Sequence, residues 1–136
     1  KQAALQLVSA GARGMKLFYP RRLPPGAGFV SPGRAYTIKT PSHKKYFAYR
    51  IVLSTGKIGE YFGLQGTTWS KPPILRNPST SKSIGGEKFR VYRDGERTRV
   101  VAWRSGRATY WVANTLSETL TEKQLLAIAR YAKPLG

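Results

Sequence analysis

The stretch from Lys88 to Val112 reads KFRVYRDGERTRVVAWRSGRATYWV and decides the fold. It contains three runs rich in β-branched and aromatic residues, a composition typical of strands. Asp94-Gly95 separates the first two runs, and Ser105-Gly106 separates the second from the third. Because Asp-Gly is a favoured hairpin turn, the sequence predicts a three-stranded antiparallel meander over residues 88–113. Basic residues alternate with apolar ones, so we expect one packed face and one charged face.

Further segments typical of strands precede the meander. Residues Ala35–Lys39 alternate polar and apolar side chains, and residues Tyr46–Ser54 form a long run of β-prone residues. A loop at 41–45 joins these two segments, and its length is common in hairpins. A third is weaker because Gly59 and Gly63 interrupt it. A fourth ends at Pro20 and fits a short edge strand. These segments are Ala35–Lys39, Tyr46–Ser54, Ile58–Gln65 and Met15–Tyr19. We expect an antiparallel sheet of about five to six strands that includes the meander.

Helices are predicted at both ends of the chain. Near the C-terminus, Thr121 and Gln124 match a capping box, and Pro134 ends the segment. Apolar residues at helical spacing form one apolar face of the predicted helix. These residues are Leu125, Ile128, Ala129 and Ala132. Residues 1–14 contain good helix formers before two glycines. We therefore expect an α+β fold, in which helix 121–133 packs on one face of the sheet and a short N-terminal helix precedes it.

No internal repeat and no linker divides the chain, so we expect one compact domain. Its expected parts are an N-terminal helix and turn (1–14), an edge segment and loop (15–34), the first strands (35–69), a surface loop rich in Pro and Ser (70–87), the meander (88–113) and the C-terminal helix (121–133).

Charge is the strongest compositional signal. The 136 residues include 24 Lys or Arg and 6 Asp or Glu, which gives a formal net charge of +18. A small domain needs a net charge of only roughly 2 to 8 for solubility. The cations are spread along the patterned segments and do not form one tail. Such a surface attracts polyanions, including nucleic acid, anionic lipid and phosphate-bearing wall polymers.

The sequence offers little for catalysis or for a metal site. It has no Cys and one His, His43, which falls in the expected loop at 41–45. The only Asp, Asp94, is explained by its turn, and among the acids only Glu60 lies in an ambiguous position. A serine nucleophile needs a base that a third group holds, and paired-carboxylate chemistry needs two facing acids. We therefore predict no catalytic residues, no metal and no cofactor.

Binding is better supported than catalysis. Alternation along the meander should turn several guanidinium groups toward one side of the sheet. The candidate polyanion-binding residues are Arg90, Arg97, Arg99, Arg104 and Arg107. Aromatic rings among cations can stack on bases or sugars, although most strand aromatics are packing residues. The candidate aromatic contacts are Tyr61, Trp69 and Trp111.

Two regions of the chain resemble a known family. The first contains YRIVL at 49–53, GEYFGLQGTTW at 59–69, PPIL at 72–75 and NPS at 77–79. The second contains VAWR at 101–104, YWVANTL at 110–116 and LTEKQLLAIA at 120–129. Together they resemble the C-terminal accessory domain of actinobacterial LytR-CpsA-Psr proteins, and the resemblance covers most of residues 35–132.

The resemblance implies an extracytoplasmic setting in the cell envelope. Members of this family are membrane-anchored enzymes that transfer glycopolymers from a polyprenyl-pyrophosphate carrier to peptidoglycan. Their catalytic domain holds the pyrophosphate and a metal ion with several Arg and Asp residues, and with Asp94 as its only Asp this chain cannot supply that set. The resemblance therefore implies an accessory domain that binds anionic wall glycopolymer or positions an upstream transferase domain.

A nucleic-acid-binding domain in the cytoplasm is the alternative that composition alone favours. A third reading is a domain that only contacts protein. No apolar run is long enough to span a bilayer, so we expect no transmembrane segment. The chain begins at Lys1 without the order of a signal peptide. We therefore expect it to be a piece of a longer protein.

Overall fold

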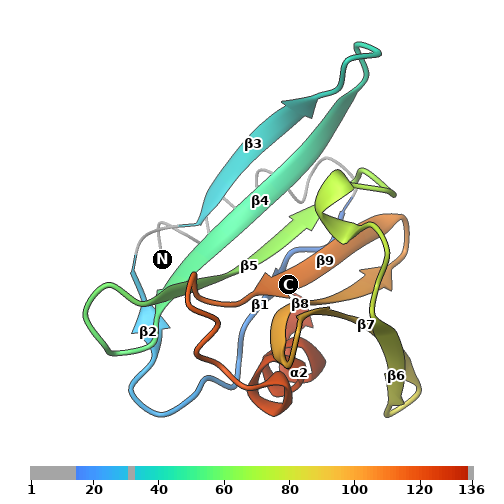
Figure 1. Ribbon diagram of the computed structural model, residues 1–136. Coiled ribbons are helices and arrows are strands. Elements are labelled where there is room, and N and C mark those ends of the chain that lie inside the picture. Colours follow the sequence, from blue (N-terminus) through green and yellow to red (C-terminus); the bar gives the residue numbers. More distant parts are fainter. Residues whose placement is uncertain (1–14, 31–32, 135–136) are drawn as a thin grey trace.

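The computed structural model describes residues 15–30 and 33–134 and is mainly β (Figure 1). The helix expected within residues 1–14 lies outside the described residues. The strands are β1 (Phe18–Tyr19), β2 (Gly28–Phe29), β3 (Arg34–Lys39), β4 (Lys45–Ser54), β5 (Tyr61–Thr67), β6 (Thr80–Ile84), β7 (Glu87–Asp94), β8 (Arg97–Ser105), β9 (Ala108–Ala113) and β10 (Lys133–Pro134). A 3₁₀ turn, η1 (Pro73–Leu75), and one α-helix, α2 (Glu122–Tyr131), complete the described part.

The expected α+β class is wrong. Within the described ranges, eight strands form one antiparallel sheet in place of five to six, two more form a small second sheet, and α2 is the only α-helix. Part of the error lies in residues 70–87, where the sequence predicts a surface loop. Its Ser- and Thr-rich end forms β6, which pairs with β7. A polar strand at a sheet edge buries little, so it leaves no alternating apolar pattern in the sequence.

The predicted meander is present as β7, β8 and β9. Gly95 and Gly106 have φ values of 62° and 60°, the left-handed conformation that these tight turns need. A bulge interrupts the β7–β8 pairing next to Tyr92. β9 also pairs with β5, so the meander joins a second run of antiparallel strands, β3, β4 and β5. The sheet order is β2-β4-β5-β9-β8-β7-β6, and β3 pairs with β4 on the same side as β2.

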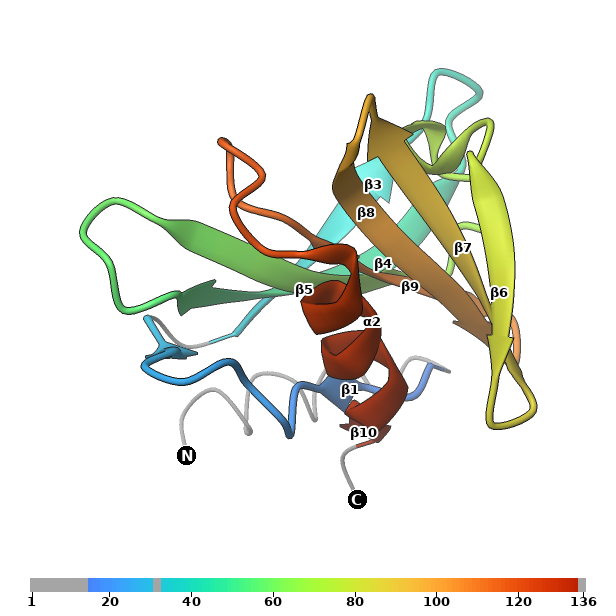
Figure 2. The ribbon, with the colours of Figure 1, turned by 60° about the horizontal axis from the view of Figure 1, so that its bottom comes forward.

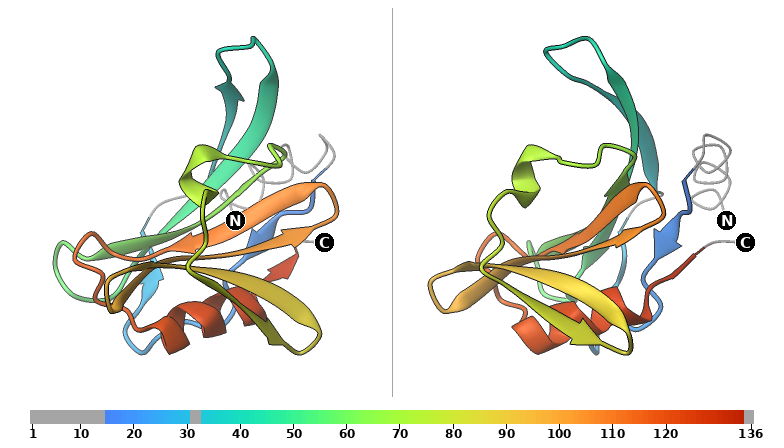
Figure 3. Two further views of the ribbon diagram at one scale, coloured as in Figure 1. Left: turned by 45° about the vertical axis from the view of Figure 1, so that its right-hand side comes forward. Right: turned by 90° about the vertical axis from the view of Figure 1, so that its right-hand side faces the viewer.

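The two faces of the sheet carry different layers. α2 lies against β8 and β9, and Figure 2 shows it in front of the curved sheet. The segment that contains η1 crosses the opposite face, and the β3–β4 hairpin projects beyond both layers (Figure 3). The middle of the meander is therefore buried on both sides. The face that was expected to be charged also carries a second apolar cluster, which contains Tyr92, Val100 and Trp111.

α2 is docked as its apolar stripe predicts. Thr121 accepts a hydrogen bond from the backbone N–H of Gln124, and the Gln124 side chain accepts one from the backbone N–H of Thr121. This confirms the predicted capping box. Leu125, Ile128 and Ala129 are buried in the main core against the sheet. The helix ends at Tyr131, and the next residues form β10, which pairs with β1.

A glycine in β5 makes room for two tyrosines. Gly66 pairs with Tyr49 on one side and with Tyr110 on the other. A Cβ atom at Gly66 would lie 2.5 Å from Tyr49 Cε1 and 2.6 Å from Tyr110 Cδ2. Both rings extend past Gly66 to residues 15–19, which we call the N-terminal segment. The Tyr49 hydroxyl donates to the Phe18 carbonyl and accepts from the Phe18 N–H, and the Tyr110 hydroxyl donates to the Lys16 carbonyl.

Gly66→Ala should destabilise the domain by about 1 to 3 kcal/mol, because the added methyl group overpacks the contact between the two rings. Equilibrium urea unfolding of the variant would measure the loss. Gly28→Ala is the control, since a Cβ atom there meets nothing within 4 Å. Equal stability of the Gly66→Ala protein and the parent would contradict this account of the packing.

Leu125→Ala should cost about 2 to 5 kcal/mol, because it removes a fully buried side chain between α2 and the sheet. Thermal and urea unfolding would measure this. A loss below about 0.5 kcal/mol would mean that the helix contributes little to the core.

Candidate functional site

The segment that contains η1 is fixed to the sheet by an apolar contact and a hydrogen bond. Leu75 packs on Tyr92 and Trp111, and the Tyr92 hydroxyl donates a hydrogen bond of 2.8 Å to the Leu75 carbonyl. Pro72 precedes the turn and Pro73 begins it, and both restrict its backbone. The segment therefore forms a stable wall beside the exposed part of the sheet.

Two clefts open on either side of Arg90. The first has a volume of about 350 Å³ and is lined by Ser70, Lys71, Pro72, Leu75, Arg76 and Arg90. The second has a volume of about 320 Å³ and is lined by Gly86, Glu87, Lys88, Arg90 and Arg104. Arg90 is the residue that the two clefts share. The five cations of the two linings, which we call the Arg90 cluster, are Lys71, Arg76, Lys88, Arg90 and Arg104.

The cations of the Arg90 cluster have no acidic partner. Within residues 15–30 and 33–134, none of their side chains makes an ion pair or a hydrogen bond. Only one carboxylate, that of Glu87, lines either cleft. The charge of Arg90 acts on nearby Tyr92, where it opposes the rise in pKa that burial causes. The cluster is therefore a site of uncompensated positive charge.

Buried polar groups without partners lie in the same part of the sheet. Arg90 Nη2, Thr109 Oγ1 and Trp111 Nε1 are buried and have no hydrogen-bond partner among the described residues. Thr109 is directly opposite Arg104, and Trp111 and Arg90 flank Ala102 on either side. Residues directly opposite each other share a face of the sheet. All three groups thus belong to the face that carries the Arg90 cluster.

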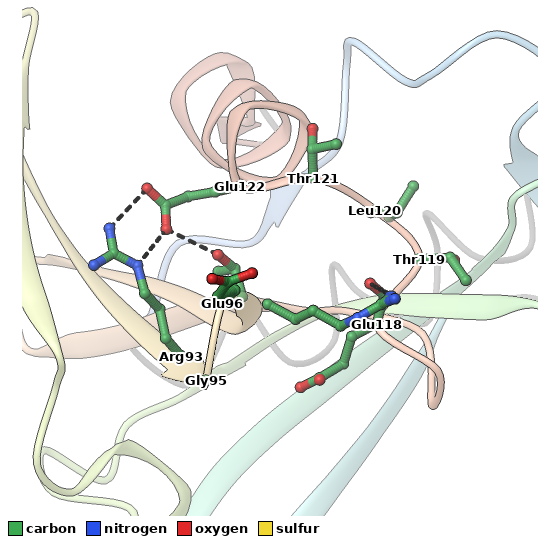
Figure 4. A pocket seen from close by; sticks show the side chains of 10 residues that line it. Arg93, Gly95, Glu96, Glu118, Thr119, Leu120, Thr121 and Glu122 are labelled. Carbon is green, nitrogen blue, oxygen red and sulfur yellow. Dashed lines mark hydrogen bonds and ion pairs between the residues drawn. The ribbon is translucent and has the colours of Figure 1, made fainter.

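The acidic residues gather elsewhere. A pocket of about 690 Å³ at the start of α2 is lined by Glu96, Glu118 and Glu122 together with Arg93, Arg97 and other residues (Figure 4). Glu122 accepts hydrogen bonds from Arg93, from Lys82 at 2.6 Å and from Thr98 at 2.8 Å. This carboxylate fixes the first turn of α2 to β6, β7 and β8. Its role is structural.

The pKa values in this pocket follow from those contacts. The hydrogen bonds from Arg93, followed by those from Lys82 and Thr98, lower the pKa of Glu122 to about 2 against the opposing effect of burial. A hydrogen bond with Asp94 raises the pKa of Glu118. Asp94 in turn pairs with Arg99 at 3.4 Å. Sequence analysis did not predict this pair of carboxyl groups, because Asp94 ends β7 and Glu118 lies in the loop before α2.

The structure divides the five predicted arginines into groups. Arg90 and Arg104 line one cleft. Arg97 and Arg99 lie at the opposite end of β8, where Arg97 donates to the carbonyls of Ser117 and Glu118. Arg107 is exposed in the β8–β9 turn, close in sequence to Arg104. Only two of the five predicted arginines therefore meet at one site.

The three candidate aromatic contacts lie apart. Tyr61 is exposed at the start of β5. Trp69 is half-buried and stacks on Tyr46, with ring centroids 5.4 Å apart. Trp111 is buried under the η1 segment. Its ring packs in the protein and does not face solvent.

Sequence analysis missed Lys71, Arg76 and Lys88. The first two lie in the segment expected to be a surface loop, and the third lies at the start of β7. One signal could have placed the loop: Ile74 and Leu75 are apolar residues between prolines and cations. Leu75 is buried, whereas Ile74 is 42% exposed, and the burial of Leu75 brings the flanking cations over the sheet.

Comparisons with known proteins add no relatives. No protein-family model, no curated protein and no solved structure matches the chain. Among the described residues, no helix has both the length and the apolar character needed to cross a membrane. The described residues also contain no group of three or more His, Asp or Glu side chains that could hold a metal ion.

Glu122→Gln should lower the free energy of unfolding at pH 7 by about 1 to 2 kcal/mol, because it weakens charge-assisted hydrogen bonds to partly exposed cations. The pKa of Glu122 is lowered from 4.5 to about 2, so its carboxylate stabilises the fold above about pH 4.5. That contribution is lost as the pH falls toward 2. Urea unfolding at several pH values would test whether the difference from the parent shrinks on acidification. A difference that stays constant from pH 7 to pH 3 would contradict this.

Proposed function

We propose that this chain is a non-catalytic, strongly basic accessory domain that binds a linear anionic polymer. The Arg90 cluster carries the proposal, because it places five cations around two clefts with one lining carboxylate. Unpaired cations in concave surfaces attract anions more strongly than scattered surface charges do. A polymer gains from this arrangement because several of its charges bind at once.

The distribution of charge over the rest of the fold supports a polymer over a small anion. The β3–β4 hairpin projects from the body of the molecule (Figure 3) and bears exposed cations at Arg34, Lys39 and Arg50. The first acid in the sequence is Glu60, so this hairpin contains none. Four of the six acids, Asp94, Glu96, Glu118 and Glu122, lie at or near the pocket at the start of α2. A chain of negative charges can therefore contact both the cluster and the hairpin without meeting that acidic region.

The polymer that we propose is an anionic wall glycopolymer. The resemblance of residues 35–132 to the accessory domain of LytR-CpsA-Psr proteins supports this choice, together with an extracytoplasmic location and an attached transferase domain that this domain could position. In this proposal the domain raises the local concentration of polymer near the transferase by long-range attraction.

The state of the carboxylates supports a non-catalytic role. Glu122 is ionised and accepts bonds from three side chains. Asp94 pairs with Arg99, and Glu60 accepts hydrogen bonds from Thr55 and Thr119. A general base needs a free lone pair directed at its substrate. These carboxylates hold loops and elements together.

Duplex DNA is the second candidate, and the β3–β4 hairpin is the observation that favours it. A two-stranded β-ribbon fits the major groove, and this ribbon bears cations along its length. Exposed Lys44 and Lys45 lie at its tip.

The test measures the affinity of the protein for poly(glycerol phosphate), duplex DNA and single-stranded RNA, at about 50 and 200 mM salt. Affinity should fall steeply with salt, because binding releases counterions; for duplex DNA with three to five phosphate contacts the fall is roughly 40-fold to 500-fold. Tightest binding to poly(glycerol phosphate) supports the wall polymer, and tightest binding to either nucleic acid overturns that choice.

The variant for this test is Arg90→Gln with Arg104→Gln, which should weaken binding and reduce its salt dependence. The control, Lys57→Gln with Lys123→Gln, removes the same charge from exposed positions outside both clefts. Affinity that does not change with salt would overturn the proposal, and so would equal losses in the two double variants.

A further inference from the structure

The side chains around Arg90 select a ligand that accepts hydrogen bonds. The side chains of arginine and lysine only donate hydrogen bonds. The single acceptor-only side chain in either lining is Glu87. A ligand that satisfies these groups must offer several oxygen acceptors and negative charge. Phosphate groups fit this requirement, and arginine binds them with two parallel bonds.

Arg90 itself is built as a ligand-binding residue. Its side chain is partly buried, and its Nη2 atom is fully buried without a hydrogen-bond partner among the described residues. An unpaired buried charge costs free energy. Such groups in native structures call for an explanation, of which an ion or ligand at the site is one. The open clefts on both sides of Arg90 provide the space for that ligand.

Two neutral groups strengthen this assignment because they lie on the same face. Thr109 is fully buried and directly opposite Arg104. Trp111 is 4% exposed and lies one strand from Ala102, which is opposite Arg90. Neither the Thr109 hydroxyl nor the Trp111 N–H has a partner among the described residues. Unsatisfied buried groups are rare in native proteins, and here three of them lie close together.

The position of Arg90 between the clefts suggests the form of the ligand. Lys71 and Arg76 line the first cleft, and Lys88 and Arg104 line the second. One guanidinium group with five donors can serve a group on each side. We infer that the Arg90 cluster is a specific phosphate site, in which Arg90 bridges two consecutive phosphate groups of a polymer and one pair of cations holds each group. This inference rests on the proposed function, since it names the chemistry that the polymer must carry.

The experiment uses substitutions that keep the charge. Non-specific electrostatic attraction depends only on that charge, whereas a specific phosphate site depends on the paired N–H donors of the guanidinium group. Arg90→Lys keeps the charge and loses the paired donors. Arg21→Lys is the matched control on an exposed arginine outside both clefts and outside the β3–β4 hairpin. Linear polyphosphate and polyglutamate of equal charge are the two polymer probes, and inorganic phosphate is the small probe. Thermal unfolding of both variants checks that the fold is kept.

The parent should bind polyphosphate at least about 10-fold more tightly than polyglutamate, which corresponds to about 1.4 kcal/mol. Arg90→Lys should lose most of that preference while it still binds both polymers in a salt-dependent way. Arg21→Lys should keep the preference. In ¹H–¹⁵N spectra of the parent, inorganic phosphate should shift the Arg90 Nε–H signal saturably, whereas chloride at equal ionic strength should not.

Two results would overturn the phosphate site: equal affinity of the parent for the two polymers, or a preference that survives Arg90→Lys. Signals that respond alike to phosphate and chloride would also overturn it. These failures would leave salt-dependent polymer binding intact. Loss of the proposed function would show differently, as absence of polymer binding in the parent itself.

Glu87→Gln supplies a test of opposite sign. It removes the one carboxylate that lines the clefts, so it should tighten polyphosphate binding about 2-fold to 5-fold, as expected for a modest electrostatic gain at an exposed position. Glu96→Gln is the control, because Glu96 lies in the pocket at the start of α2. Equal effects of the two substitutions on polyphosphate affinity would contradict a local site.

Discussion

The fold depends on a glycine at position 66, where no side chain separates two neighbouring tyrosines. Without a Cβ atom at this position, the rings of Tyr49 and Tyr110 approach across β5, with centroids 6.3 Å apart. Their hydroxyls then hold the backbone of Lys16 and Phe18. Burial keeps both phenols protonated, since it raises the pKa of Tyr49 well above its usual value and that of Tyr110 to about 12. One glycine therefore fixes the N-terminal segment on the same face as α2.

The main core occupies one face of the sheet, so the opposite face is left for other side chains. The main core lies between the sheet, α2 and the N-terminal segment, so its apolar side chains point away from the η1 side. The η1 side has a small cluster around Leu75 and Trp111. Around this cluster, the strands can carry Arg90 and Arg104 without loss of the main core. The main core and the proposed polymer site thus lie on different faces of one sheet.

Local signals in the sequence predicted the meander turns and α2, because Asp94-Gly95, Ser105-Gly106 and the Thr121 capping box act over a few residues. The class was wrong in part because β6 is a polar edge strand, and its pairing with β7 leaves no apolar pattern. The site was predicted only in part. Arg90 and Arg104 follow from strand alternation, whereas Lys71 and Arg76 join them only because Leu75 folds back on the sheet, which is a tertiary contact that spacing does not encode.

The polarity of the sheet edges has a consequence for self-association. β6 reads Thr-Ser-Lys-Ser-Ile, and β3 at the other side bears Arg34 and Lys39. Polar and charged side chains on an exposed edge oppose strand pairing between copies. Under the proposed function, a polyanion bound along the cations of β3 would neutralise that edge. Copies gathered on one polymer would then lie close enough to pack, and the polymer would act as their template.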